Sequence, residues 1–91
     1  MKIIGIETRT TNQNGQAMKD IGGLWNQFYS ENIQSKILNA VNSNVYAIYT
    51  DYESDYTGEY TTLLGLEVSS LDEIPSRLVG REFPKQNFKR F

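Results

Sequence analysis

The most regular pattern in the chain is a pair of alternating segments, residues 45–51 and 59–68, separated by a short polar stretch. Side chains of an extended strand point alternately to its two faces, so the second segment presents an apolar stripe on every other residue from Leu64 to Val68. The polar stretch ends on Gly58, which freely adopts the positive φ angles of tight turns. The pattern predicts an antiparallel β-hairpin whose apolar stripe is covered by a helix.

The other face of the predicted hairpin combines rings with acids, because we expect it to hold Tyr49, Glu59, Leu63 and Glu67. Such a surface suits an organic cation, since ring faces attract positive charge and a carboxylate neutralises it. The same pattern is typical of the solvated side of an antiparallel sheet, where Tyr is a favoured strand residue. The pattern alone favours this second interpretation over a ligand pocket.

The segments around the hairpin predict one main helix and two further strands. Residues 1–10 alternate β-branched side chains as a strand does, and residues 78–83 resemble a strand near the C-terminus. From about Gln16 to Ser30, apolar side chains recur at the spacing of an amphipathic helix, with Asn12 or Asn14 as the expected N-cap. The stripe that we expect to face the sheet comprises Met18, Ile21, Trp25 and Phe28, with Leu24 alongside.

Two glycines interrupt this helix. Gly22 and Gly23 each cost about 1 kcal/mol relative to Ala, so their presence asks for a compensating reason. Close approach of the helix to the sheet is the favoured reason, and room for a ligand beside Trp25 is the alternative. Ser30 is expected to cap a second short helix over residues 31–38.

Composition narrows the chemistry available to the chain. Its 91 residues suit one small domain over residues 1–91, and 38% hydrophobic with 22% charged residues is typical of globular proteins. The absence of Cys and His excludes thiol nucleophiles, disulfides, the usual zinc sites and the commonest general base. No phosphate loop, dinucleotide fingerprint or nucleophile elbow is present. We therefore expect no catalytic residues, no metal site and no cofactor.

Charge is unevenly distributed about the net value of −2. Residues 1–76 hold four basic and ten acidic side chains, whereas residues 77–91 hold five basic and one acidic. The acidic main body would repel a phosphate backbone, so we expect no direct nucleic-acid binding by this chain. The sequence shows neither a signal peptide nor an apolar run of bilayer length, so we expect a cytoplasmic protein without membrane contact.

Four runs of sequence carry a resemblance to a known family. They are IGIETRTTN (4–12), IGGLWNQFYS (21–30), VYAIYTDYESDYTGEYTTLLGLEVSSLDEIP (45–75) and the strand that follows. Together these runs resemble the GyrI-like effector-binding domains, which occur fused to AraC-type and MerR-type transcription regulators. Stand-alone relatives include the integron-cassette effector-binding proteins.

This resemblance implies an α+β fold in which a helix packs on an antiparallel sheet. The family pattern is a pair of two-layer β-α-β-β repeats of the SHS2 type, with a cleft between them for lipophilic, often cationic, drug-like molecules. The chain is about half as long, and it resembles the first repeat over residues 1–75 and the start of the second over residues 76–91. The ligand-facing positions that the resemblance implies are Trp25, Tyr49, Glu59 and Tyr60.

The implied function is ligand sensing by a small-molecule effector-binding domain, with Glu59 as the counter-charge to a cation. A hydrolase of reactive drug-like compounds and a protein-binding module of the gyrase-inhibitor type are the alternatives. A single repeat would leave a sheet edge and three aromatic residues without partners, so we expect a dimer formed through the C-terminal strands. Those aromatic residues are Phe83, Phe88 and Phe91.

Overall fold

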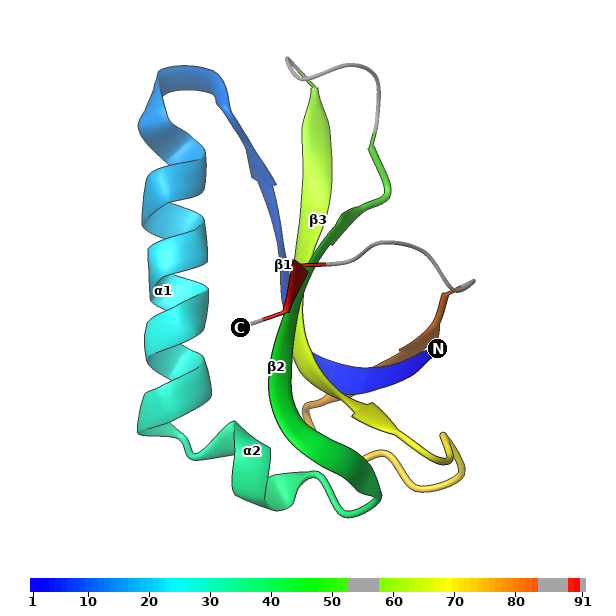
Figure 1. The fold of residues 1–91 in the computed structure, drawn as a ribbon. Coiled ribbons are helices and arrows are strands. Elements are labelled where there is room, and N and C mark those ends of the chain that lie inside the picture. The colour runs from blue at the N-terminus through cyan, green and yellow to red at the C-terminus, as the bar shows by residue number, and fades with distance from the viewer. Residues whose placement is uncertain (53–57, 84–88, 91) are drawn as a thin grey trace.

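A five-stranded antiparallel sheet carries one main helix on one face, as the computed structural model shows for residues 1–52, 58–83 and 89–90 (Figure 1). The predicted α+β fold is confirmed. The strands lie in the order β4-β1-β3-β2-β5. In chain order the elements are β1 (Lys2–Thr11), a 3-10 turn (Gln13–Gly15), α1 (Gln16–Ser30), α2 (Ile33–Lys36), β2 (Ala40–Thr50), β3 (Glu59–Val68), β4 (Val79–Glu82) and β5 (Lys89–Arg90).

Strands β2 and β3 form the predicted hairpin. Ile48 lies opposite Leu63, and β1 runs antiparallel along the other side of β3 over its whole length. Strand β2 begins earlier than the sequence pattern predicts, because Ala40 pairs with Val68 before an irregular stretch that precedes Val45. The polar residues of that stretch conceal the start of the strand in the sequence.

Gly5 of β1 and Gly65 of β3 lie opposite each other in the centre of the sheet. A Cβ atom on Gly65 would lie 2.5 Å from the carbonyl oxygen of Ile4 and 2.8 Å from Cγ2 of Ile3. Real Cβ atoms do not come so close to backbone, so the centre of the sheet requires glycine here.

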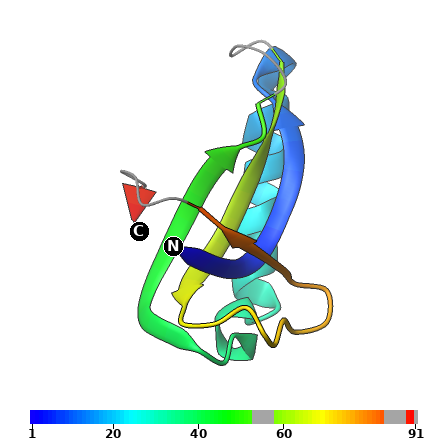
Figure 2. The same cartoon turned by 90° about the vertical axis from the view of Figure 1, so that its right-hand side faces the viewer.

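Apolar side chains fill both faces of the sheet. The sheet curls, so that β4 and the start of β1 lie on the side away from α1 (Figures 1 and 2). Phe83, which we expected to lack a partner, packs against the second cluster, whereas Phe88 and Phe91 lie outside the described residues. The helix-side core includes Ile4, Ile6, Leu24, Phe28, Ile33, Ile37, Val45, Ala47, Leu64, Leu66 and Val68, and the second cluster comprises Ile3, Tyr46, Ile48 and Leu63.

Helix α1 presents a different stripe to the sheet from the one predicted. Leu24 and Phe28 are buried and Trp25 is half-buried, but Met18 is 83% exposed. Met18 lies about 120° round the helix from Leu24, so it falls on the flank of α1. The prediction that Met18 packs on the sheet is therefore wrong, because the side of α1 that is buried is the one that carries Leu24 and Phe28.

The predicted helix caps are also wrong. Gly15, with φ 71°, stands at the N-cap position of α1, and neither Asn12 nor Asn14 caps the helix. The side chain of Asn12 instead accepts a hydrogen bond from the hydroxyl of Tyr60. Ser30 closes α1 and does not cap the second helix, which is shorter than predicted.

Gly22 and Gly23 do not approach the sheet. Both are exposed, and a Cβ atom added to either would meet nothing within 4 Å outside its own neighbourhood in the helix. Close packing, the favoured explanation for these glycines, is therefore wrong. Their cost to helix stability has no compensation in the packing of α1.

Candidate functional site

Tyrosine rings gather where β2 ends and β3 begins. We call Tyr49, Tyr52 and Tyr60 the tyrosine cluster. The ring of Tyr60 stacks with that of Tyr52 at a centroid distance of 5.3 Å and meets Tyr49 edge-on at 6.1 Å. Tyr60 is only 5% exposed, whereas Tyr49 is 40% and Tyr52 54% exposed. The cluster is thus a buried ring that supports two rings open to solvent.

The strand register decides which face of the sheet carries these rings. Tyr49 lies opposite Thr62, so it shares a face with Tyr60 and with the helix-side core residue Leu64. The prediction that Tyr49 shares the other face with Glu59 is therefore wrong. Alternation along one strand does not reveal how that strand is paired with its neighbour.

Tyr52 reaches the cluster through a break in the alternation. A regular strand would place it on the face that carries Ile48. Strand β2 ends at Thr50, and Asp51 adopts a left-handed conformation with φ 56°. Asp tolerates this conformation better than most residues, and here it lets Tyr52 stack on Tyr60.

Polar groups hold the buried ring of the cluster. The hydroxyl of Tyr60 donates a hydrogen bond of 2.8 Å to Oδ1 of Asn12. Burial, and then the neighbouring phenols of Tyr49 and Tyr52, raise the pKa of Tyr60 above its ordinary value of 10.0. Tyr60 is therefore a neutral hydrogen-bond donor with a fixed ring position.

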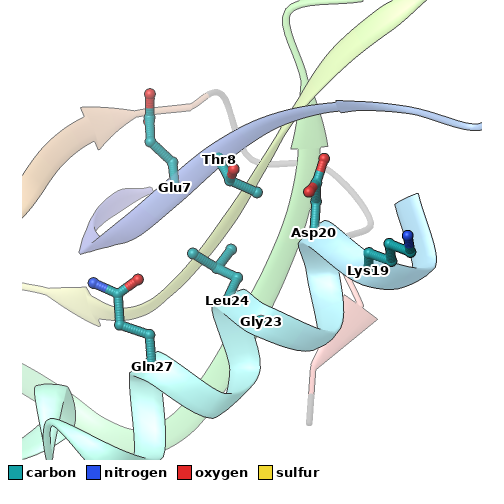
Figure 3. A pocket seen from close by; sticks show the side chains of 7 residues that line it. All are labelled: Glu7, Thr8, Lys19, Asp20, Gly23, Leu24 and Gln27. Carbon is teal, nitrogen blue, oxygen red and sulfur yellow. The ribbon is translucent and has the colours of Figure 1, made fainter. Parts of the chain in front are cut away.

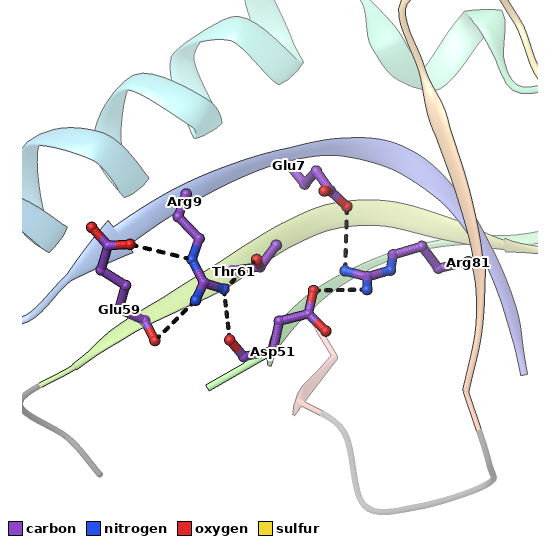
Figure 4. A network of polar contacts seen from close by, with 6 residues as sticks. All are labelled: Glu7, Arg9, Asp51, Glu59, Thr61 and Arg81. Carbon is purple, nitrogen blue, oxygen red and sulfur yellow. Dashed lines mark hydrogen bonds and ion pairs between the residues drawn. The ribbon is translucent and has the colours of Figure 1, made fainter. Parts of the chain in front are cut away.

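Glu59 lies on the opposite face of the sheet, away from α1 (Figure 4). Its carboxylate is 3.7 Å from Nε of Arg9. The same guanidinium donates hydrogen bonds to Thr61 Oγ1 at 3.0 Å and to the carbonyl oxygen of Asp51 at 2.6 Å. The structure therefore separates Glu59 from the tyrosine rings and pairs it with an arginine.

A second arginine occupies the same open face. Nη2 of Arg81 lies 2.7 Å from Oδ2 of Asp51, and Nη1 lies 3.4 Å from Oε1 of Glu7 (Figure 4). Three acids of this face, Glu7, Asp51 and Glu59, are thus paired with arginines from β1 and β4. For these three residues, the network explains the acidic positions as partners of arginines.

Trp25 belongs to a second group of rings, on α1. It stacks with Tyr29 at 5.8 Å and meets Phe28 at a steep angle at 6.5 Å. From the helical rise, it lies about 14 Å along α1 from Gln16, the end of the helix next to the tyrosine cluster. Trp25 therefore shares the helix side of the sheet with the cluster but belongs to a separate group of rings.

Of the predicted site residues, the structure brings only Tyr49 and Tyr60 together. Tyr52, which completes their cluster, was missed by the sequence reasoning. Its signal would have been the end of β2 at Thr50, but the change of backbone conformation at Asp51 is not visible in the alternation.

A groove also runs along the other flank of α1, against β1 (Figure 3). Its volume is about 250 Å³, which is below the usual range of pockets for drug-sized ligands. Gly23 leaves this groove open, since it carries no side chain. The lining residues are Glu7, Thr8, Lys19, Asp20, Gly23, Leu24 and Gln27.

Within residues 1–52, 58–83 and 89–90, no group of three or more acidic, His or Cys side chains is placed to hold a metal ion. In the same residues, no helix has the length and apolar character needed to cross a membrane.

The sequence also matches a known protein family. The model of the Cass2 family, described as integron-associated effector binding protein, matches residues 1–91. The chain belongs to this family. The resemblance to integron-cassette effector-binding proteins is thereby confirmed, and the family name indicates the binding of an effector.

The fold of this Cass2 family member also matches a solved structure, the integron cassette protein VCH_CASS2 from the mobile metagenome of Vibrio cholerae. The sequences are 28% identical and the TM-score is 0.65. The match covers 99% of this chain but 56% of the other, so this chain spans little more than half the length of its relative. A search of curated proteins gave no significant match.

Proposed function

We propose that the chain is a small-molecule effector-binding module whose ligand is flat and lipophilic and lies against the tyrosine cluster. The observation that carries this proposal is the pair of partly exposed rings, Tyr49 and Tyr52, fixed on the buried ring of Tyr60. Rings that are held in place lose little freedom when a ligand stacks on them. Membership of an effector-binding family supports the same function.

The energetics favour moderate affinity. A stacked pair of rings contributes about 0.5–1.5 kcal/mol beyond the area that it buries, and a cation over a ring about 0.5–2 kcal/mol. Contacts with two or three rings support a Kd on the order of micromolar once the cost of association is subtracted. Because Glu59 faces Arg9 on the other side of the sheet, a cationic ligand gains only the attraction of the ring faces. We therefore expect neutral and cationic ligands of one shape to differ by less than about tenfold.

Trp25 is proposed as the far end of the same binding face. It lies on the helix side of the sheet, and its neighbour Tyr29 is exposed. A long ligand would extend from the tyrosine cluster toward this pair. The wider role that the resemblance implies, ligand sensing in a cytoplasmic transcription regulator, is part of this proposal.

The test compares two exposed tyrosines. A rhodamine dye is titrated with the protein and its fluorescence anisotropy is recorded for the wild type, Tyr52→Leu and Tyr29→Leu. We expect Tyr52→Leu to weaken binding about fivefold or more and Tyr29→Leu to weaken it less. Equal binding by Tyr52→Leu and the wild type would contradict the assignment to the tyrosine cluster.

The same titration separates binding from hydrolysis. We expect mass spectrometry to recover the dye unmodified after prolonged incubation with the protein, because we propose a binding module and no catalyst. Conversion of a reactive ester analogue at a rate that depends on protein concentration would favour the hydrolase alternative.

Self-association through the C-terminal strands remains part of the proposal. Strands β4 and β5 lie at the two edges of the sheet, and β5 covers only Tyr46 and Ala47 of its neighbour. Exposed backbone edges pair with other chains, and Val41 adds an exposed apolar side chain on β2, the neighbour of β5. We expect light scattering to return a dimer at tens of micromolar and Val41→Lys to shift it toward the monomer. A wild-type monomer under these conditions would contradict the dimer.

A further inference from the structure

A second hollow lies at the opposite end of the sheet from the tyrosine cluster. It is bounded by the end of α2 and by the loop that joins β3 to β4, and its volume is about 440 Å³. This volume falls within the range of pockets that take drug-sized ligands, about 300–1,000 Å³. The lining residues are Lys36, Leu38, Asp72, Glu73, Ile74 and Pro75.

The two walls of this hollow are held together by backbone contacts. Ala40, just after the α2 wall, pairs with Val68, just before the loop wall. The next residue of the loop, Ser69, donates its N–H to the carbonyl oxygen of Asn39 at 3.0 Å. The distance between the walls is therefore set by the end of the β2–β3 hairpin.

The loop wall is packed onto the sheet. Ile74 lies over Gly80 of β4, where an added Cβ atom would come within 2.6 Å of Cδ1 of Ile74 and 3.1 Å of Cδ2 of Leu71. At the end of the loop, Leu78 donates its N–H to the carbonyl oxygen of Pro75 at 3.0 Å. These contacts fix the position of the loop wall, so the hollow is already formed in the absence of a ligand.

The chemistry of the lining combines apolar surface with acids. Leu38 is 70% exposed and Ile74 is 43% exposed, so the lining presents apolar surface to solvent. Asp72 and Glu73 lie beside them and are exposed. Neither carboxylate forms an ion pair with a residue in the described part of the chain, unlike Glu59 and Asp51 on the open face.

We propose that this hollow is a second ligand site, and that it takes a small lipophilic molecule with one positive charge. Its apolar body would cover Leu38 and Ile74, and its ammonium group would lie near Asp72 and Glu73. The occupant is a small molecule because the volume of the hollow fits one. It is positively charged because the two acids and the single Lys36 leave the lining with one excess negative charge. Within the described part of the chain, this site offers carboxylates without an ion pair, whereas the carboxylate of Glu59 lies on the other face from the tyrosine cluster and is paired with Arg9.

The test uses two probes that differ only in charge. The chain is labelled with ¹⁵N, and amide shifts are followed on addition of 4-phenylbutylammonium or its neutral analogue 4-phenylbutan-1-ol. We expect the ammonium to shift amides around Leu38 and Ile74 and to bind about three- to tenfold more tightly than the alcohol. Equal affinity for the two probes, or shifts confined to the tyrosine cluster, would overturn the proposal.

Two sets of variants complete the test. Asp72→Asn with Glu73→Gln should remove the preference for the ammonium, whereas the matched control Asp20→Asn with Glu31→Gln, which makes the same change in net charge elsewhere, should retain it. Leu38→Ser should weaken both probes about fivefold, and it should leave the protein folded because the side chain of Leu38 is 70% exposed. A preference that survives the first double substitution would refute the site. The dye titration of Tyr52→Leu is independent of this result, so the two proposals can fail separately.

Discussion

Replacing the helix glycines with alanine should stabilise the protein. Gly22 and Gly23 are exposed in the middle of α1, and an added Cβ atom meets open space at both positions. Nothing in the packing therefore opposes the gain in helix propensity, which is about 0.8–1 kcal/mol for each Gly→Ala change. The double substitution should raise the free energy of unfolding by about 1.5–2 kcal/mol, since each change acts on backbone freedom.

Urea unfolding followed by circular dichroism at 222 nm measures this change. An increase of about 1 kcal/mol for each single variant should raise the melting temperature by roughly 4–8 °C in a domain of this size. Loss of stability in either variant would show that helix and sheet approach more closely than the structure has them. A stabilised Gly23→Ala variant would also show that folding does not require the glycine that keeps the groove against β1 open.

Three other substitutions test separate parts of the structure. Gly65→Ala should cost about 3 kcal/mol or more in urea unfolding, because its Cβ atom would lie 2.5 Å from the carbonyl oxygen of Ile4; a variant as stable as the wild type would contradict the register. Tyr60→Phe should cost about 0.5–1.5 kcal/mol in urea unfolding. Folding raises the pKa of Tyr60, so the wild type should lose stability as pH rises from its unfolded pKa near 10 through the folded value, and Tyr60→Phe should lack this part of the loss. Arg81→Met should cost about 1 kcal/mol or less, with a smaller difference in 0.5 M NaCl, because its ion pair with Asp51 is partly exposed; a loss that is unchanged by salt would contradict an electrostatic role.

Much of the fold follows from the sequence because the long elements have strong periodicity. The hairpin and the bounds of α1 agree with the pattern of apolar residues. The buried face of α1 was harder to predict, since spacings of three and four residues fit two overlapping rows of apolar residues, one with Leu24 and one with Met18. Which row is buried depends on the side of α1 that contacts the sheet, and the structure buries Leu24.

The candidate site was less predictable, because it depends on strand register and on one backbone angle. Pairing with β3 places Tyr49 beside Tyr60, and the left-handed conformation of Asp51 brings Tyr52 to the same ring. Neither feature leaves a periodic signal in the sequence. The partner of Glu59 could not be predicted for a similar reason, since Arg9 and Glu59 lie on neighbouring strands, β1 and β3, that are distant in the chain.

The most direct test of effector binding at the tyrosine cluster is an amide-resolved titration of the ¹⁵N-labelled chain with a flat, neutral, lipophilic compound such as a coumarin. If the ligand stacks on the exposed rings, the largest shifts should lie at Tyr49, Tyr52 and Tyr60, with saturation in the micromolar range. Smaller shifts should extend toward Trp25. Shifts centred on Glu59 and Arg9, on the open face of the sheet, would contradict the proposed site, as would the absence of any saturable change up to millimolar compound.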